Sequence, residues 1–444
     1  MGASQHAPQP RTLALALMAA LAVTACDDGL PSEAASGQPT SVRLNMDAVQ
    51  LLVGEDTTVS ATLYDRNNQP TADPSGAYRL TWSSSDSDVA SVVNGVIRAI
   101  GIGRATVTAV AASLPAARVE IEVPAPGTLI DRFHAIPLGR LGATQSNGWA
   151  INDAGVVAGW SNVSGGRAFR WSEAEGMTAL PGISSSRGIN SAGAIVGHFN
   201  HPSGFSAYVF DTGVRIDLTP LDAGSNSNAY RINDSGTVVG RSTAGRAVAW
   251  RRGADGRYGA PVALGYRNSN DSPVINGRGD IAFTAFSPSF TGLNEPVLWR
   301  IQPDGSYGDA LFLGRPAGGS YFVRDINDAG LIVGFRWTGT IEMAVLWHPA
   351  DYAAPIDLGV GEAWGINNRG WIVGGTGGDL PSFGGVPRRP ALWVVDTSSS
   401  VHGPYDIGTP GGFDYGAARA INDHGWITGS AWGPGEIMAT LWRP

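Results

Sequence analysis

A pattern of apolar and polar positions returns seven times between residues 149 and 442. In each copy an Ile-Asn pair meets a short polar turn, an apolar run follows, and an Ala-rich run closes on an aromatic residue. The Asn residues that mark the copies are Asn152, Asn190, Asn233, Asn276, Asn327, Asn367 and Asn422. A supersecondary unit that repeats about every 40–50 residues is the signature of a propeller or a solenoid. The pattern therefore predicts a repeat architecture.

The first repeat shows the content of one unit. Apolar runs lie within 149–160, at 168–171 and at 177–180, and turn-forming residues separate them. These runs predict four short antiparallel strands, called A to D here, which is the content of one propeller blade.

The turn between strands A and B is the best specified part of the repeat. The fourth residue, counting from Asn, is always Gly: Gly155, Gly193, Gly236, Gly279, Gly330, Gly370 and Gly425. A type I turn followed by a residue in the left-handed region makes a compact hairpin, and Gly adopts that region without steric cost. We therefore interpret these Asn and Gly residues as structural turn residues.

The second position of the same turn could instead suggest a calcium loop. It holds Asp153, Ser191, Asp234, Gly277, Asp328, Asn368 and Asp423, all of which are turn formers. Calcium needs six to eight oxygen ligands, and Ser191 and Gly277 break the carboxylate pattern without breaking the turn pattern. The sequence favours turn chemistry over a metal site.

Strand C closes on an aromatic residue in every repeat. The residues are Trp171, Phe210, Trp250, Trp299, Trp347, Trp393 and Trp442. Large rings at one register fill the wedge between adjacent sheets, so we expect them in the core. The alternative is a ring of exposed aromatics that stack on sugars.

These motifs resemble the HAF-type repeat of bacterial exported proteins, a family whose members mostly lack an assigned activity. The Ile-Asn-Asp-x-Gly-x-Val-Val-Gly string and the Ala-x-x-Trp strand carry the resemblance, which covers about 300 residues. The fourth repeat departs most, because Phe283 stands where the other copies have the terminal Gly. Its edge is a candidate for a specialised surface.

The last repeat predicts how the ring closes. In the first six copies strand D is marked by Leu180, Leu218, Leu264, Leu313, Leu358 and Ile407, whereas the seventh stops at Pro444. An unclaimed strand lies at 133–139, and its Leu138 precedes Asn152 by 14 residues, within the internal range of 9 to 15. We therefore expect Ala135–Leu138 to pair with Ala439–Trp442. The prediction for 130–444 is a seven-bladed β-propeller closed by an N-terminal strand, which leaves no open sheet edge.

Residues 41–123 alternate apolar and polar positions over short runs, a period that predicts a β-sandwich. The strings at 80–86, 89–92 and 95–109 resemble the bacterial immunoglobulin-like domain, group 2. The resemblance implies an immunoglobulin-like sandwich, which in that family mostly serves as a spacer. We expect Trp82 in its core. Residues 124–129 form a short linker whose two prolines make it stiff.

The N-terminus predicts export and a lipid anchor. The apolar run Leu13–Val23 has the length of a signal-peptide core and is too short to cross a bilayer. Val23-Thr24-Ala25-Cys26 resembles the lipobox of bacterial lipoproteins, which implies cleavage after residue 25 and diacylglycerol on Cys26. The alternative is an ordinary secretory signal with a nearby Cys, but Cys26 is the single cysteine and an exported free thiol is a liability. Residues 26–40 then form a flexible tether.

Charge and candidate chemistry narrow the function only a little. A net charge of −8 without a basic cluster argues against nucleic acid. His198 and His201 lack the further ligands of a zinc site, the Gly-rich stretch 374–378 has no following helix to bind phosphate, and the carboxylates are scattered. Arg231, Arg324 and Arg419 could line a channel mouth, although a solvated Arg at a strand edge is the commoner explanation. No catalytic, cofactor or metal residue is nominated.

The sequence thus predicts an all-β protein, lipid-anchored to the bacterial membrane through Cys26, in which a spacer carries a propeller. A binding or scaffolding role for a monomer, with a cell-surface glycan or protein as ligand, is the leading hypothesis. The alternative is a propeller enzyme that acts on polysaccharide or glycoconjugate.

Overall fold

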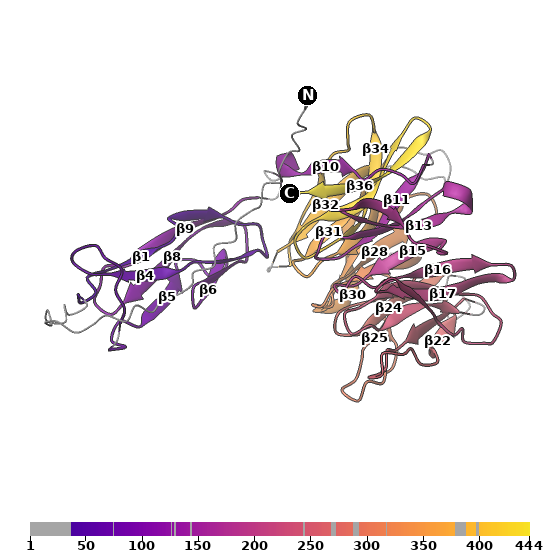
Figure 1. Ribbon diagram of the computed structural model, residues 1–444, viewed down its shortest axis with the longest axis horizontal. Coiled ribbons are helices and arrows are strands. Elements are labelled where there is room, and N and C mark those ends of the chain that lie inside the picture. Colours follow the sequence, from indigo (N-terminus) through magenta and orange to yellow (C-terminus); the bar gives the residue numbers. More distant parts are fainter. Residues whose placement is uncertain are drawn as a thin grey trace, which may run out of the picture.

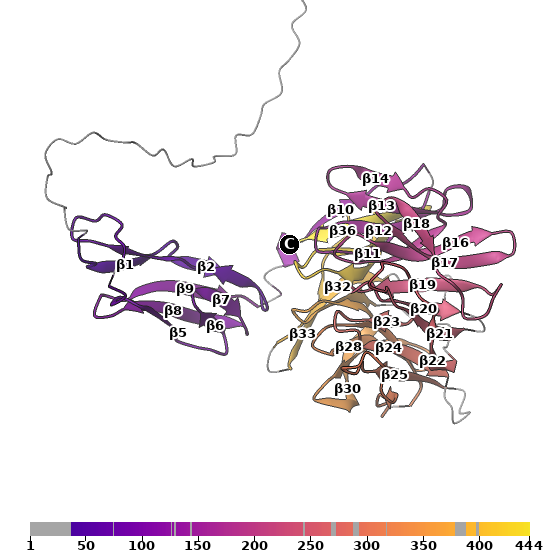
Figure 2. The same ribbon diagram turned by 60° about the horizontal axis from the view of Figure 1, so that its bottom comes forward.

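The computed structural model describes residues 37–73, 75–125, 127, 130–142, 144–242, 245–267, 272–286, 293–316, 318–377, 388–396 and 399–444. The predicted signal peptide 1–25, Cys26 and most of the tether lie outside these residues. The described chain is all β, with short 3-10 turns at Ile130–Arg132 and Val163–Gly165. Strands β1–β9 form an elongated unit beside a larger body built from β10–β36 (Figures 1 and 2).

The N-terminal unit contains three small sheets within 41–123. Their strand orders are β1 (Ser41–Leu44)–β4 (Ala61–Tyr64), β2 (Ala48–Gln50)–β9 (Ala117–Val123)–β8 (Gly103–Ala111)–β5 (Leu80–Ser84), and β3 (Asp56–Thr58)–β7 (Val96–Ala99)–β6 (Ala90–Val93). Alternate residues of β8 and β9 are buried, as the period of two predicts. Ile97, Val107 and Ile121 form the core, and Trp82 packs against it while partly buried.

The larger body follows the repeat. Four sheets each have four strands in chain order. The first contains β11 (Ser146–Ile151), β12 (Val157–Ser161), β13 (Arg167–Ser172) and β14 (Gly176–Ala179), and the second β15 (Ser185–Ile189), β16 (Ile195–His201), β17 (Gly204–Asp211) and β18 (Val214–Asp217). The third contains β19 (Ser227–Ile232), β20 (Val238–Ser242), β21 (Arg246–Trp250) and β22 (Val262–Arg267), and the fourth β23 (Val274–Ile275), β24 (Ile281–Phe286), β25 (Asn294–Trp299) and β26 (Leu311–Phe312). The strands are antiparallel throughout, as the repeat predicts.

The fifth and sixth repeats share one continuous strand. Their sheet has the order β27 (Ser320–Ile326), β28 (Ile332–Trp337), β29 (Glu342–His348), β30 (Asp351–Ile366), β31 (Trp371–Thr376), β32 (Arg389–Val395) and β33 (Val401–Asp406). Residues 351–360 of β30 pair with β29, whereas 361–366 pair with β31. The strand therefore ends the fifth unit and begins the sixth.

The predicted closing strand is present. The last sheet has the order β10 (His134–Pro137), β36 (Glu436–Arg443), β35 (Ile427–Gly433) and β34 (Tyr415–Ile421). Ala135 lies opposite Trp442, and the Leu138 N–H donates to the Ala439 carbonyl at 2.8 Å. Leu138 is buried together with Trp171 and Leu441. The pairing of Ala135–Leu138 with Ala439–Trp442 is thus confirmed.

The Asn side chains join the innermost strands into a closed cycle. Each Nδ2 donates to the main-chain carbonyl of the Asn in the next repeat, at 2.9 to 3.3 Å. The Asn422 Nδ2 donates to the Asn152 carbonyl, which closes the cycle. Each Oδ1 accepts the N–H four residues ahead. The same amide therefore fixes its own turn and links neighbouring repeats, a role beyond the one the sequence predicts. The result is a ring of sheets, a propeller-like architecture.

The turn glycines and the strand C aromatics lie where the sequence predicts them. All seven glycines have positive φ, between 74° and 99°. The strand C tryptophans are at most 9 % exposed, and Phe210 is partly buried. Several indoles also donate a hydrogen bond to a main-chain carbonyl of the preceding repeat, for example Trp250 Nε1 to the Thr219 carbonyl at 2.7 Å. These rings are core, and the sugar-stacking alternative for them is wrong.

The fourth repeat is remodelled. In the first repeat a Cβ on Gly159 would lie 2.1 Å from the Asn147 carbonyl oxygen, so that position needs Gly. In the fourth, the first strand is shortened to Val274–Ile275, and Phe283 stacks on Trp299 with ring centroids 4.6 Å apart. A surface hollow of about 340 Å³ lies beside this repeat, with Arg278, Asp280, Arg300 and Tyr352 among its lining residues.

The N-terminal unit contacts the ring at the A–B turn of the sixth repeat. Leu51, Leu52 and Val53 share a hydrophobic cluster with Trp371. The Trp371 Nε1 donates to the Val53 carbonyl at 3.2 Å, and Arg369 lies 3.3 Å from Glu55. The contact places the unit on the same face of the ring as the A–B turns.

Candidate functional site

A β-bulge in strand A aims one side chain of most repeats into the axis of the ring. In six of the described A strands the pairing register shifts across the residue three before Asn. The skipped residues are Trp149, Arg187, Tyr230, Arg324, Trp364 and Arg419. A bulge adds one residue to a strand and re-aims its side chain. The fold therefore brings six residues that are far apart in sequence to one place.

These six residues line a small cavity, which we call the Arg–Trp cavity. Arg231, Ser272 and Val323 complete its lining, and its volume is about 60 Å³. Arg231, Arg324 and Arg419 thus line the channel, and the interpretation of these residues as solvated at a strand edge is wrong. No sequence motif distinguishes Trp149, Arg187, Tyr230 and Trp364, so these cavity residues could not be predicted.

Guanidinium and indole groups alternate around the cavity. The Arg187 and Arg419 Cζ atoms lie 4.4 and 4.8 Å from the Trp149 ring centroid. The Arg419 and Arg324 Cζ atoms lie 4.0 and 4.3 Å from the Trp364 centroid. Such cation–π contacts hold the planar guanidinium groups in fixed orientations.

Two of these cations form no ion pair within the described part of the chain. Among the described residues, no carboxylate lies within 4.0 Å of Arg187 or Arg419, and the buried Nε atom of each makes no hydrogen bond. Burial lowers the pKa of Arg419 to about 10, although Glu362 opposes this effect, and burial also lowers the pKa of Arg187. An Arg guanidinium stays protonated in proteins at neutral pH, so both groups carry a positive charge.

Behind the cavity wall lies a buried ion cluster. The Arg388 guanidinium bonds to Glu362 at 2.5 Å and also to Glu342, and Arg324 lies 3.5 Å from Glu362. Burial raises the pKa of Glu362, but Arg324 and Arg388 outweigh burial and hold it below its ordinary value. Burial and the neighbouring Glu362 raise the pKa of Glu342 to about 7. The carboxylates are scattered along the sequence, yet the fold brings Glu342 in β29 and Glu362 in β30 together from neighbouring repeats.

The raised pKa of Glu342 predicts a pH dependence of stability. Between the unfolded pKa, about 4.3, and the folded value of about 7, the folded state holds a proton that the unfolded state has lost. This group therefore lowers the free energy of unfolding as pH rises through that window. We expect Glu342→Gln to remove this part of the slope in denaturant titrations at pH 4.5 to 8. Glu120→Gln, an exposed carboxyl, serves as control, and equal slopes in wild type and Glu342→Gln would contradict the assignment.

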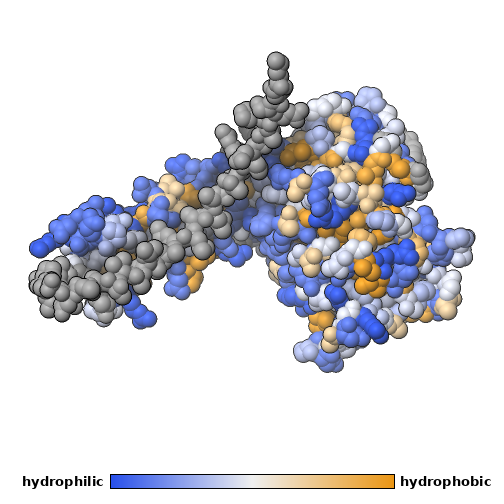
Figure 3. Space-filling view, in the orientation of Figure 1, coloured by the Kyte–Doolittle hydropathy of each residue, from blue (hydrophilic) through white to orange (hydrophobic). Residues whose placement is uncertain are grey.

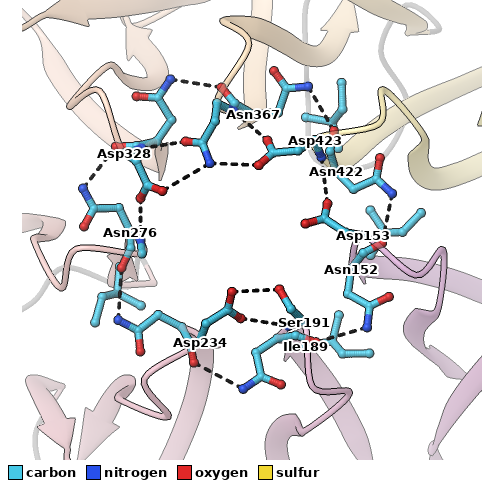
Figure 4. Close-up of a pocket in the computed structure, with 18 of the residues that line it drawn as sticks. Asn152, Asp153, Ile189, Ser191, Asp234, Asn276, Asp328, Asn367, Asn422 and Asp423 are labelled. Atoms are coloured by element: carbon cyan, nitrogen blue, oxygen red, sulfur yellow. Dashed lines mark hydrogen bonds between the residues drawn. The ribbon is translucent and has the colours of Figure 1, made fainter. Parts of the chain in front are cut away.

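The other end of the channel is an acidic mouth, formed by the A–B turns and enclosing about 220 Å³. Figure 4 shows Asp153, Asp234, Asp328 and Asp423 around its opening. Most side chains at this second turn position accept the N–H of the preceding repeat, as Asp423 does from Asn368 at 2.8 Å. Asn368 also donates to the Asp328 and Asp423 carboxylates. The turn formers thus have a second role as links between repeats.

The two His residues weighed as zinc ligands have other partners in the structure. No group of three or more His, Cys, Asp and Glu among the described residues has the arrangement of a metal site. His198 packs against Phe205, and burial and Arg187 lower its pKa; His201 bonds to Ser203 and Ser206.

The part of the chain that the structure describes contains no helix with the length and apolar character of a membrane span.

No protein-family model and no curated protein sequence matches the chain, so the two family resemblances stay predictions. The solved structures of similar shape include the following three. A Bacteroides thetaiotaomicron protein of unknown function is 12 % identical, with TM-score 0.44, over 92 % of this chain and 99 % of its own. The β-propeller domain of the trilobed protease from Pyrococcus furiosus is 10 % identical, with TM-score 0.46, over 68 % and 95 %. A gluconolactonase from Xanthomonas campestris is 17 % identical, with TM-score 0.36, over 71 % and 91 %.

Proposed function

We propose that the protein is a lipid-anchored, exported binding protein, in which an immunoglobulin-like spacer carries a seven-bladed propeller head away from the bacterial membrane. The observation that carries the binding role is the Arg–Trp cavity. Its walls hold guanidinium, indole and phenol groups, which bind and orient a ligand. A nucleophile with its base is not among the lining residues.

The position of the spacer supports an outward binding face. The spacer contacts the A–B turn of the sixth repeat, and the same turns form the acidic mouth. The Arg–Trp cavity lies at the middle of the A strands, at the residue three before Asn, and the channel end beyond it is opposite the turns. If the spacer leads to the membrane, that end of the channel points away from it.

One face of the head has no broad hydrophobic surface. On the face seen in Figure 3, hydrophobic residues form small patches scattered among hydrophilic ones. A broad hydrophobic docking surface would need a contiguous patch of several hundred Å². This face therefore supports recognition of the ligand by the polar and aromatic groups of the channel.

The second candidate is an enzyme that acts on polysaccharide or glycoconjugate. Glu342 and Glu362 favour it, because two carboxyl groups whose pKa values are pushed apart resemble an acid and base pair. However, neither carboxyl lines the Arg–Trp cavity or the acidic mouth, and both are bound to Arg388. An ion cluster that joins the fifth and sixth repeats accounts for them.

A screen of the purified head tests the binding role. The chain from residue 124 onward is incubated with cell-wall fragments, glycans and envelope proteins, and both bound ligand and reaction products are measured. We expect at least one class to bind without being altered. The proposal fails if nothing binds while some substrate is turned over.

The lipid anchor has its own test. Cys26→Ser removes the thioether attachment, and a chain without another apolar anchor should leave the membrane fraction. We expect nearly all of the variant in the soluble exported fraction, whereas Ser36→Ala, in the same tether, should stay with the membranes. If Cys26→Ser still sediments with membranes, the lipobox interpretation is wrong.

A further inference from the structure

We infer that the Arg–Trp cavity binds a compact oxyanion, a carboxylate or phosphate group, at Arg187 and Arg419. This inference rests on the proposed binding role and names the chemistry of the ligand. It starts from the charges of the wall. Four Arg side chains line the cavity, and the described acidic groups beside them are Glu362, Glu342 and Asp325.

These acidic groups are already engaged elsewhere. Glu342 is bound to Arg388, and Glu362 is shared between Arg388 and Arg324. The Asp325 carboxylate accepts the Ile366 N–H at 3.1 Å while facing Arg231. Arg187 therefore retains uncompensated positive charge at the cavity, and Glu362 offsets that of Arg419 only in part. A buried charge without a partner is costly, and an oxyanion in the cavity would supply that partner.

The unsatisfied groups of the wall are donors. The Nε atoms of Arg187 and Arg419 and the Nε1 atom of Trp364 are buried without a hydrogen-bond partner among the described residues. A wall rich in donors fits an acceptor-rich ligand rather than a cation or an apolar group. Because Trp149 and Trp364 hold the guanidinium planes in place, ordering these side chains on binding costs little conformational entropy.

The geometry disfavours a neutral sugar. Each of the two indole rings already has two guanidinium groups over it. A sugar ring stacks on an open aromatic face, and these faces are covered. The volume of about 60 Å³ suits a group of a few heavy atoms, so only the acidic end of a larger ligand would enter.

The acidic mouth determines from which end of the channel an anion can enter. Asp153, Asp234, Asp328 and Asp423 surround the channel on the A–B turn side. They lie four residues along the strand direction from the bulge residues, which is about 13 Å at the rise of an extended chain. An anion is repelled at that mouth and attracted at the other end, so we expect it to enter from the side away from the spacer.

The test uses the chain from residue 27 onward, so that spacer and head are both present. Acetate, inorganic phosphate, galacturonic acid and an oligogalacturonate are titrated by calorimetry and by tryptophan fluorescence, at low and high salt. We expect saturable binding of at least one, weakened by salt. In Arg187→Gln and Arg419→Gln the dissociation constant should rise about tenfold or more. Arg389→Gln, which removes an exposed charge, should leave it unchanged.

The set of probes separates the sources of the anion. Phosphate alone would indicate a phosphate ligand, acetate and galacturonic acid a free carboxylate, and tighter binding of the oligogalacturonate an acidic glycan. Arg419→Lys keeps the charge and guards against a folding defect, because it should retain weak binding. The inference is overturned if none of these anions binds, or if binding is unchanged in Arg187→Gln and Arg419→Gln. If a protein or neutral glycan binds the head equally well in these variants, the inference fails while the binding role stands.

Discussion

Deletion of residues 128–139 is expected to open the ring and make the protein aggregate. The deletion removes β10, which covers the edge of β36, and it removes the buried Leu138 that packs against Trp171 and Leu441. The exposed strand edge would then offer unpaired N–H and carbonyl groups to another chain. Size-exclusion chromatography with light scattering of the purified variant measures the result.

Two variants serve as controls for this deletion. Leu138→Ala should lower the free energy of unfolding by about 2–5 kcal/mol, as a buried Leu does, whereas Leu311→Ala, at an exposed Leu in β26, should cost less than about 1 kcal/mol. Removing residues 27–123 should leave the ring folded, although it uncovers Trp371. A soluble, cooperatively folded protein after deletion of 128–139 would contradict closure by β10.

The second large effect is expected from Asn367→Ala. The Asn367 side chain is 3 % exposed; its Oδ1 accepts the Trp371 N–H at 2.9 Å and its Nδ2 donates to the Asn422 carbonyl at 2.9 Å. Alanine leaves both main-chain groups buried without these partners. At about 1–3 kcal/mol for each unsatisfied group, we expect a loss of about 2–4 kcal/mol in denaturant unfolding.

The neighbouring residue offers a matched control. Asn368 carries the same amide but is exposed at the acidic mouth. Asn368→Ala should therefore cost less than about 1 kcal/mol, since water replaces the lost bonds. Equal losses in the two variants would mean that the closed cycle of Asn side chains contributes little.

The features that local chemistry dictates could be predicted from the sequence. Gly155 and its six counterparts mark a turn that only a left-handed residue completes, and they all have positive φ. Leu138 was identifiable because it keeps the strand D spacing, and its main-chain bond to Ala439 repeats that of Leu180 to Ala168. Such features depend on residues close in sequence or on a fixed register.

The channel could not be predicted in the same way. A β-bulge shifts the register by one residue and so changes which side chain faces the axis. Because the bulge positions hold Trp, Arg or Tyr in different repeats, they form no motif. The contact of Glu342 and Glu362 with Arg388 likewise depends on how the fifth and sixth repeats lie beside each other.

We propose that the head binds a ligand at its axis and does not transform it. The most direct measurement is mass spectrometry of an oligogalacturonate or muramidase-released cell-wall fragment after prolonged incubation with an equimolar amount of the head, in native and denatured samples. We expect a one-to-one complex in the native sample, absent in Arg419→Gln, and a ligand of unchanged mass after denaturation. Release of a fragment of new mass by the wild-type head would refute this proposal.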